Sequence, residues 1–161
     1  MATPAFDRTV ELRAGSSRDL NEVMSVMDAA FGDKFGEAWT RSQCAGILPM
    51  AGVSLMVARE VESRAVIGFS LSRMVADEAE LLLLAVEPGR HRQGIGALLL
   101  EDFMQHARAA GLSRVHLEVR DGNRAVEMYL RAGFMPVGRR LNYYHGANGN
   151  RFDALTLSQE L

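Results

Sequence analysis

Hydrophobic residues recur with a helical period in the first third of the chain. Apolar side chains spaced three and four residues apart predict a helix over residues 17–31. Ser16 and Asp19 have the spacing of a capping box at the start of that helix. Thr40 is a suitable N-cap for a shorter helix ending near Leu48, just before a proline. Two consecutive helices are therefore expected before the first long strand.

The rest of the chain switches between strand and helix patterns. The expected strands are residues 8–13, 53–59, 65–75, 80–86, 114–120, 134–143 and 152–157. The run at 80–86 is apolar on both faces, which is typical of a central strand covered on both sides. Two more helices are expected, one at 94–110 and one ending at Gly133. The order β-α-α-β-β-β-α-β-α-β-β predicts an α+β fold in which helices pack on a mixed sheet.

Composition and charge narrow the class of protein. A chain of 161 residues, 48% hydrophobic and 24% charged, fits a single domain spanning residues 1–161. The net charge of −2 argues against nucleic-acid binding. No signal sequence or membrane-length apolar run is recognised, so we expect a cytoplasmic protein that does not bind membranes. Cys44 is the only cysteine, which excludes an internal disulfide and fits a reducing compartment.

The segment Arg-His-Arg-Gln-Gly-Ile-Gly-Ala at residues 90–97 is the most informative in the sequence. It follows a buried strand and opens a helix, where unpaired amides and the helix dipole favour an anion. Glycines allow a phosphate to approach the backbone, and Arg90 and Arg92 add positive charge. Position 99 is leucine rather than the third glycine of a dinucleotide fingerprint, and no Gly-Lys-Ser/Thr exists. The sequence predicts a phosphate loop of another type; a tight turn with close helix–strand packing is the alternative.

Several spaced motifs resemble those of one known superfamily. They are His91-Arg92-Gln93-Gly94-Ile95-Gly96, Leu117-Glu118-Val119-Arg120, Asn123, Tyr129, Gly133-Phe134 and Arg139-Arg140-Leu141-Asn142-Tyr143-Tyr144. In this order they resemble the GNAT superfamily of acyl-CoA-dependent N-acetyltransferases, and most closely its RimI-like branch of ribosomal-protein-alanine N-acetyltransferases. The resemblance covers about residues 79–157, and His91 stands where the motif has Gln or Arg. It implies a mainly antiparallel central sheet of about seven strands flanked by about four helices.

The resemblance also implies a co-substrate, acetyl-CoA, and the residues that hold it. These are Leu84, Ala85, Val86, His91, Arg92, Gln93, Gly94, Ile95, Gly96, Ala97 and Asn123. It further implies that the strand at 80–86 splays from the next one and pairs with the pantetheine amides. Asn123 follows Asp121-Gly122 at a predicted helix start, so a helix cap is its alternative role. The four histidines are scattered without ligand spacing, so no metal is expected.

Acetyl transfer requires a neutral amine and a protonated leaving thiol, and two residues suit these needs. Glu118 lies on a strand whose neighbouring residues Leu117 and Val119 face the opposite side. Burial raises the pKa of a carboxylate, which suits a general base. By resemblance Glu118 is the base and Tyr129 the general acid. The alternatives are a solvated strand residue for Glu118 and a core aromatic for Tyr129.

The amine substrate is the least constrained part of the prediction. By resemblance Tyr143 and Tyr144 border the substrate entrance; their alternative role is to cover the end of a sheet. Trp39 is a candidate on the other rim of the entrance. The leading hypothesis is acetylation of a protein N-terminal α-amine, with a ribosomal protein as one candidate. The alternatives are an acetyltransferase of a small-molecule amine and a non-catalytic acyl-CoA sensor. We expect a monomer or a homodimer.

Overall fold

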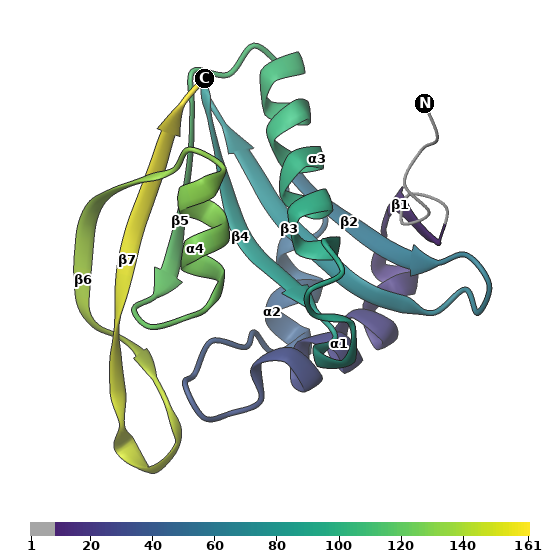
Figure 1. Ribbon diagram of the computed structural model, residues 1–161, viewed down its shortest axis with the longest axis horizontal. Coiled ribbons are helices and arrows are strands. Elements are labelled where there is room, and N and C mark those ends of the chain that lie inside the picture. The colour runs from purple at the N-terminus through teal and green to yellow at the C-terminus, as the bar shows by residue number, and fades with distance from the viewer. Residues whose placement is uncertain (1–8) are drawn as a thin grey trace.

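The computed structural model describes residues 9–161, so the first residue of the strand expected at 8–13 lies outside the described residues. The strands are β1 (Val10–Ala14), β2 (Val53–Glu60), β3 (Val66–Val75), β4 (Glu78–Val86), β5 (Arg114–Arg120), β6 (Met135–His145) and β7 (Arg151–Glu160). The helices are α1 (Leu20–Phe31), α2 (Arg41–Ile47), α3 (Ile95–Ala109) and α4 (Ala125–Arg131), and short 3₁₀ turns lie at Ser17–Asp19, Pro88–Arg90 and Ala147–Gly149 (Figure 1). The predicted order of elements is confirmed.

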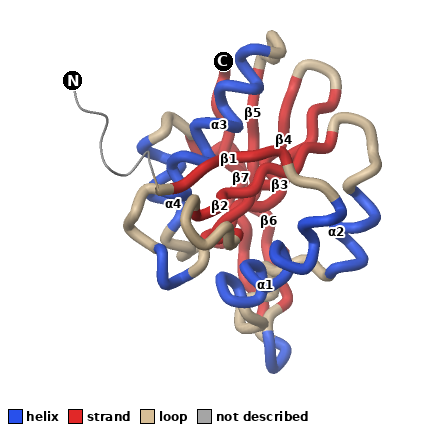
Figure 2. The backbone as a smooth tube through the Cα atoms, turned by 90° about the vertical axis from the view of Figure 1, so that its right-hand side faces the viewer, coloured by secondary structure: helices blue, strands red, loops and turns tan. Residues whose placement is uncertain are grey.

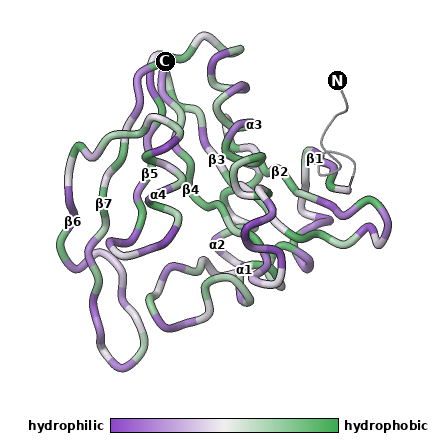
Figure 3. Tube along the Cα trace, in the orientation of Figure 1, coloured by the Kyte–Doolittle hydropathy of each residue, from purple (hydrophilic) through white to green (hydrophobic). Residues whose placement is uncertain are grey.

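The seven strands form one sheet in the order β1-β2-β3-β4-β5-β7-β6. All neighbouring strands are antiparallel except β4 and β5, which are parallel. This is the mainly antiparallel mixed sheet that the resemblance implied. The predicted central strand is indeed central: β4 is hydrophobic from its middle to its end (Figure 3).

Helices cover both faces of the sheet (Figure 2). One core contains apolar residues of α1 with Leu55, Val57, Phe69 and Leu83 of β2–β4. The opposite core places residues of α3 and α4 against the apolar side of β5 and β7. Because α1 and α2 pack on β2–β4, the polar side of β5 and β7 is left open beside them. Among residues 9–161, none of the helices is long and apolar enough to cross a membrane.

The sheet opens at its centre. Strands β4 and β5 are paired only from Glu78↔Arg114 to Leu81↔Leu117. The remaining residues, 82–86 on β4 and 118–120 on β5, have no partner on each other's strand, and the two strands separate in Figure 1. Backbone groups along this gap are therefore available to a ligand.

The helix starts follow the capping pattern of the sequence. The Ser16–Asp19 capping box is present, but it opens a 3₁₀ turn that leads into α1 at Leu20. Thr40 caps α2, and its box partner is Gln43. Both boxes satisfy amides that a helix start leaves unpaired.

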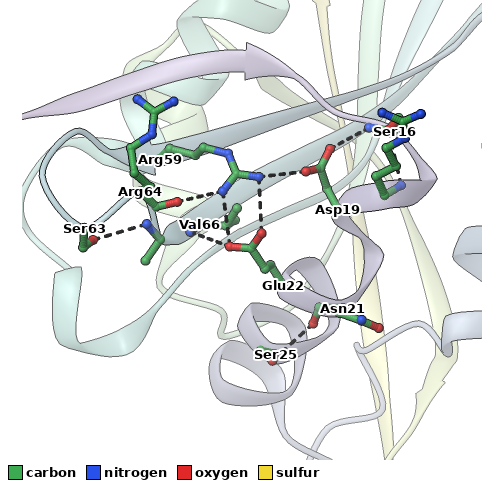
Figure 4. Close-up of polar contacts among 11 residues, drawn as sticks. Ser16, Asp19, Asn21, Glu22, Ser25, Arg59, Ser63, Arg64 and Val66 are labelled. Atoms are coloured by element: carbon green, nitrogen blue, oxygen red, sulfur yellow. Dashed lines mark hydrogen bonds and ion pairs between the residues drawn. The ribbon is translucent and has the colours of Figure 1, made fainter.

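Arg59 ties α1 to the β2–β3 hairpin (Figure 4). Its guanidinium contacts Asp19 Oδ1 at 2.8 Å and Glu22 Oε1 at 3.3 Å, and it donates to the carbonyl of Arg64 at 2.7 Å. Glu22 also accepts from the amide of Val66 at 3.2 Å. This network holds the first helix against the sheet and so fixes the segment that follows it.

Candidate active site

A cleft of about 1280 Å³ follows the opening between β4 and β5. Its walls are the β4 segment 80–86, the loop and helix start at 90–97, and the segment 117–131 from β5 through α4. The segment between α1 and α2 and the tyrosine pair of β6 close one end. Every site residue that the sequence predicted, except Gln93, lines this cleft.

The phosphate-loop segment has the backbone that an anion site needs. Gly94 is the residue before α3 and has a φ of 76°, a left-handed conformation that glycine adopts without strain. No side chain caps the first turn of α3, and the first amides of a helix have no acceptor within it. Arg92, at φ 65°, is exposed beside them. The arrangement fits the pyrophosphate of a CoA molecule.

His91 and Arg90 hold this loop in place. A ring nitrogen of His91, Nε2, lies 3.1 Å from the carbonyl oxygen of Val86, so the ring donates to the end of β4. The guanidinium of Arg90 forms an ion pair with Glu60 at the end of β2. Arg90 thus faces a carboxylate of the protein, and it also lines the cleft beside the phosphate loop.

Gly96 lies where β4, α3 and α4 converge. A Cβ atom at this position would lie 3.3 Å from Met128 Sδ and 3.7 Å from a methyl carbon of Leu84. Leu84, Ala85 and Val86 belong to the part of β4 that β5 does not pair. Their backbone faces the cleft in the region where the pantetheine arm of CoA was expected.

Glu118 points to the open side of the sheet, away from the buried side chains of Leu117 and Val119. Its side chain is 12% exposed. Thr156 donates its hydroxyl to Glu118 Oε2 at 2.8 Å, and Arg140 Nε lies 2.9 Å from Oε1. Each carboxylate oxygen thus has a polar partner. These partners come from β6 and β7, so the sequence around Glu118 does not reveal them.

Tyr129 is 5% exposed and packs edge-to-face against Phe134, with ring centroids 5.9 Å apart. Burial raises the pKa of the phenol, and the nearby charge of Glu37 raises it further. The hydroxyl therefore stays protonated well above neutral pH. The two roles considered for Tyr129 are compatible, since the ring belongs to the core while the residue lines the cleft.

Asn123 begins α4. Its Oδ1 accepts from the amide of Ala125 at 2.8 Å, and its Nδ2 donates to Glu37 Oε2 at 2.7 Å. The cap role considered for Asn123 is thus present. Glu37 lies in the segment between α1 and α2, 86 residues away, so its contact could not be read from a local motif.

The aromatic residues at the end of the cleft come from two segments. Tyr143 and Tyr144 stack edge-to-face at 4.9 Å, and burial is the main cause of a raised pKa at Tyr144. Trp39 is half-buried against the α1 core and lines the cleft across from them. The two segments touch, because Gly36 lies so close to the carbonyl of His145 that a Cβ atom there would clash with it.

Three residues contact predicted site residues although the sequence assigned them no role in the chemistry: Glu37, Arg140 and Thr156. Arg120 in turn contacts Glu37. For two of these residues, the alternation of polar and apolar positions along a strand indicated which face of the sheet they occupy. Arg120 and Thr156 occupy polar positions of alternating strands, on the same face as Glu118. Among residues 9–161, no group of three His, Cys, Asp or Glu side chains is arranged to hold a metal ion.

Comparison with known proteins identifies the family. The acetyltransferase (GNAT) family model matches residues 20–134. The [ribosomal protein bS18]-alanine N-acetyltransferase of Haemophilus influenzae is 35% identical over 98 residues, which are 61% of this chain and 67% of the relative. The enzyme of the same description from Escherichia coli K12 is 37% identical over 91 residues, 56% of this chain and 61% of the relative.

The fold comparison agrees over nearly the whole chain. The crystal structure of the ribosomal-protein-S18-alanine N-acetyltransferase from Escherichia coli superposes with a TM-score of 0.83 at 26% identity, covering 94% of this chain and 93% of that chain. The family match, the sequence relatives and this fold agree with one another. The chain belongs to the acetyltransferase (GNAT) family and is an acetyl-CoA-dependent N-acetyltransferase.

Proposed function

We propose that this protein acetylates the N-terminal α-amine of a protein, with Glu118 as general base and Tyr129 as general acid. The observation that carries the proposal is that both residues line one cleft at the opening between β4 and β5. Acetyl-CoA supplies the acetyl group. The amides of residues 94–97 bind its pyrophosphate, and the backbone of Leu84–Val86, which pairs with β3 but not with β5, aligns its pantetheine arm.

Glu118 prepares the amine for attack. A protonated amine carries no lone pair, so its proton must first pass to the Glu118 carboxylate, directly or through a water molecule. Thr156 fixes the orientation of the carboxylate through Oε2. Arg140 is 62% exposed, so its ion pair with Oε1 is weak and the incoming amine can displace it.

Tyr129 completes the transfer. The amine nitrogen bonds to the acetyl carbon, the carbon–sulfur bond breaks, and the sulfur takes the phenolic proton of Tyr129. The nitrogen loses its remaining surplus proton to water, and a proton from water restores the phenol. A thiol has a pKa of about 8.5, whereas the pKa of Tyr129 is raised by burial. Acidity alone therefore does not drive the proton transfer; placement of the hydroxyl beside the sulfur does.

Two observations favour a protein α-amine as the acceptor. The relatives from Haemophilus influenzae and Escherichia coli are described as enzymes that act on an alanine of ribosomal protein bS18. An α-amine also has a pKa of about 8, against about 10.4 for lysine, so it loses its proton more easily. We extend the proposal to a ribosomal protein beginning with alanine as substrate. We also place the enzyme in the cytoplasm, whose reducing conditions suit the free Cys44.

A peptide panel tests the proposal. Purified protein and acetyl-CoA are incubated with an alanine-starting peptide, the same peptide with a blocked N-terminus and a free lysine, and a set of small amines. Release of CoA and the mass of each acceptor are measured. Acetylation of the free N-terminus alone supports the proposal. Acetylation of a small amine but of no peptide overturns the choice of acceptor, and absence of any turnover with CoA bound indicates a sensor.

A further inference from the structure

Glu37 is a mostly buried carboxylate that lines the cleft, and neither chemical step of the proposed reaction uses it. Its side chain is 9% exposed, and it belongs to the segment joining α1 to α2. Burial of a charged group is costly unless it is paired and hydrogen-bonded. Asn123 Nδ2 donates to Glu37 Oε2 at 2.7 Å. Arg120 Nε lies 3.2 Å from Glu37 Oε1, in an ion-pair contact rather than an aligned hydrogen bond.

Both partners lie at the ends of the elements that carry the chemistry. Arg120 is the last residue of β5, two residues beyond Glu118. Asn123 lies two residues before α4 and is bonded to its first turn: its Oδ1 accepts from the amide of Ala125, and its main-chain carbonyl accepts from the amide of Val126 at 3.1 Å. A continuous hydrogen-bonded chain therefore runs from Glu37 through Asn123 into the first turn of α4.

Helix α4 needs such a support. It has seven residues, and helices this short gain their stability from tertiary contacts. The side chain of Asn123 caps its first turn, whereas Arg124 at the N-cap position makes no side-chain cap bond. Tyr129 lies one turn after the start of α4, so a shift of that start moves the phenol.

The segment that carries Glu37 is itself well anchored. Phe35 stacks edge-to-face on Phe152 of β7 at 5.0 Å, and the Arg120 guanidinium lies 3.6 Å from the centre of the Phe35 ring. The amide of Ala147 donates to the carbonyl of Lys34 at 3.3 Å. Glu37 thus reaches Asn123 from a segment fixed against β7 and the β6–β7 turn, and it can transmit that fixed position to α4.

We propose that Glu37 is a positioning residue that holds Asn123 and, through it, sets helix α4 and the hydroxyl of Tyr129 for protonation of the leaving thiol. This inference rests on the proposed function for the role of Tyr129. The positioning itself is independent of that function and can be measured without catalysis.

The first test measures the helix directly. In Glu37→Gln, hydrogen exchange of the α4 amides should become faster, because a neutral amide holds Asn123 less strongly than a carboxylate does. Asp33→Asn, which removes an exposed carboxylate from the same segment, should leave exchange unchanged. Unchanged exchange in Glu37→Gln overturns the proposal whether or not the protein proves to acetylate peptides.

Swapping the amide and the carboxylate between positions 37 and 123 distinguishes loss of their contact from a general folding defect. Asn123→Asp keeps a side-chain acceptor for the Ala125 amide but sets two carboxylates against each other. It should also accelerate exchange in α4. Adding Glu37→Gln to it restores an amide–carboxylate pair, and most of the protection should return. Equal exchange in the single Asn123→Asp and double variants contradicts a direct Glu37–Asn123 contact.

The catalytic test is a double-mutant cycle. Glu37→Gln should lower kcat by about 10–10²-fold, with an unchanged dissociation constant for acetyl-CoA and partial rescue by a thioester whose leaving thiol is more acidic. In a Tyr129→Phe background the same change should cost less than about twofold, since the group being positioned is gone. Full multiplication of the two losses overturns the link to Tyr129. A wild-type protein without acetyltransfer overturns the proposed function instead, and the exchange experiment still decides the positioning.

Discussion

Replacing Glu118 by glutamine separates a catalytic role from a structural one. Glutamine keeps the shape of the side chain and can still accept the Thr156 hydroxyl, which lies 2.8 Å from Oε2. What is lost is the negative charge that faces Arg140 at 2.9 Å. The variant therefore removes the proton acceptor while changing little else in the cleft.

The two expected effects differ enough to be told apart. The ion pair with Arg140 is mostly exposed, so its loss should change stability by at most about 1 kcal/mol. For a chain of this size that is a shift in Tm of about 2–4 °C. Loss of a general base slows the reaction about 10²–10⁴-fold, which corresponds to about 3–5 kcal/mol of barrier. A structural residue would show the first effect without the second.

The assay is the rate of CoA release at saturating acetyl-CoA, measured from neutral to alkaline pH. The deficit of Glu118→Gln should shrink as pH rises, because the free amine accumulates as pH passes its pKa of about 8 and no base is then needed. Glu101→Gln is the matched control, since that carboxylate lies on α3, is exposed and does not line the cleft. A folded Glu118→Gln protein with a near-normal rate at neutral pH refutes the base assignment.

Three further changes probe other parts of the molecule. Gly94→Val should weaken acetyl-CoA binding in a folded protein, because a β-branched residue does not tolerate the φ of 76° that presents the amides; calorimetry giving wild-type affinity would refute the phosphate site. Tyr129→Phe should slow transfer about 10²–10⁴-fold with partial rescue by a more acidic leaving thiol, and wild-type rates on both thioesters would leave only a core role. Arg59→Met should lower the free energy of unfolding by about 1–3 kcal/mol without altering acetyl-CoA affinity, as urea denaturation can check.

The sequence was most informative where structure depends on neighbouring residues. Helical spacing, the two capping boxes and the alternation in β5 are local, and the corresponding elements are present. The glycines at the start of α3 indicate an open helix terminus because their effect on the backbone is also local. The separation of β4 from β5 has no such local signal, because pairing is a property of two segments, and only the family resemblance implied it.

Side-chain partners across the fold could not be predicted in the same way. Arg140 reaches Glu118 because a bulged β6 pairs with β7, which in turn pairs with β5. Glu37 contacts Asn123 across 86 positions of sequence. Arg90, whose charge was noted for its place beside the phosphate loop, forms an ion pair with Glu60 of β2. Each of these contacts depends on how distant segments pack together. No periodic pattern in the sequence indicates such a contact.

Identifying the atom that becomes acetylated tests the proposed activity and its base in one experiment. The protein is incubated with acetyl-CoA and one peptide that contains both a free N-terminal alanine and an internal lysine, and the product is fragmented in a mass spectrometer. We expect a single acetyl group on the α-amine, with the yield lost in Glu118→Gln and kept in Glu101→Gln. Acetylation of the lysine, or equal yields from both variants, would contradict the proposal.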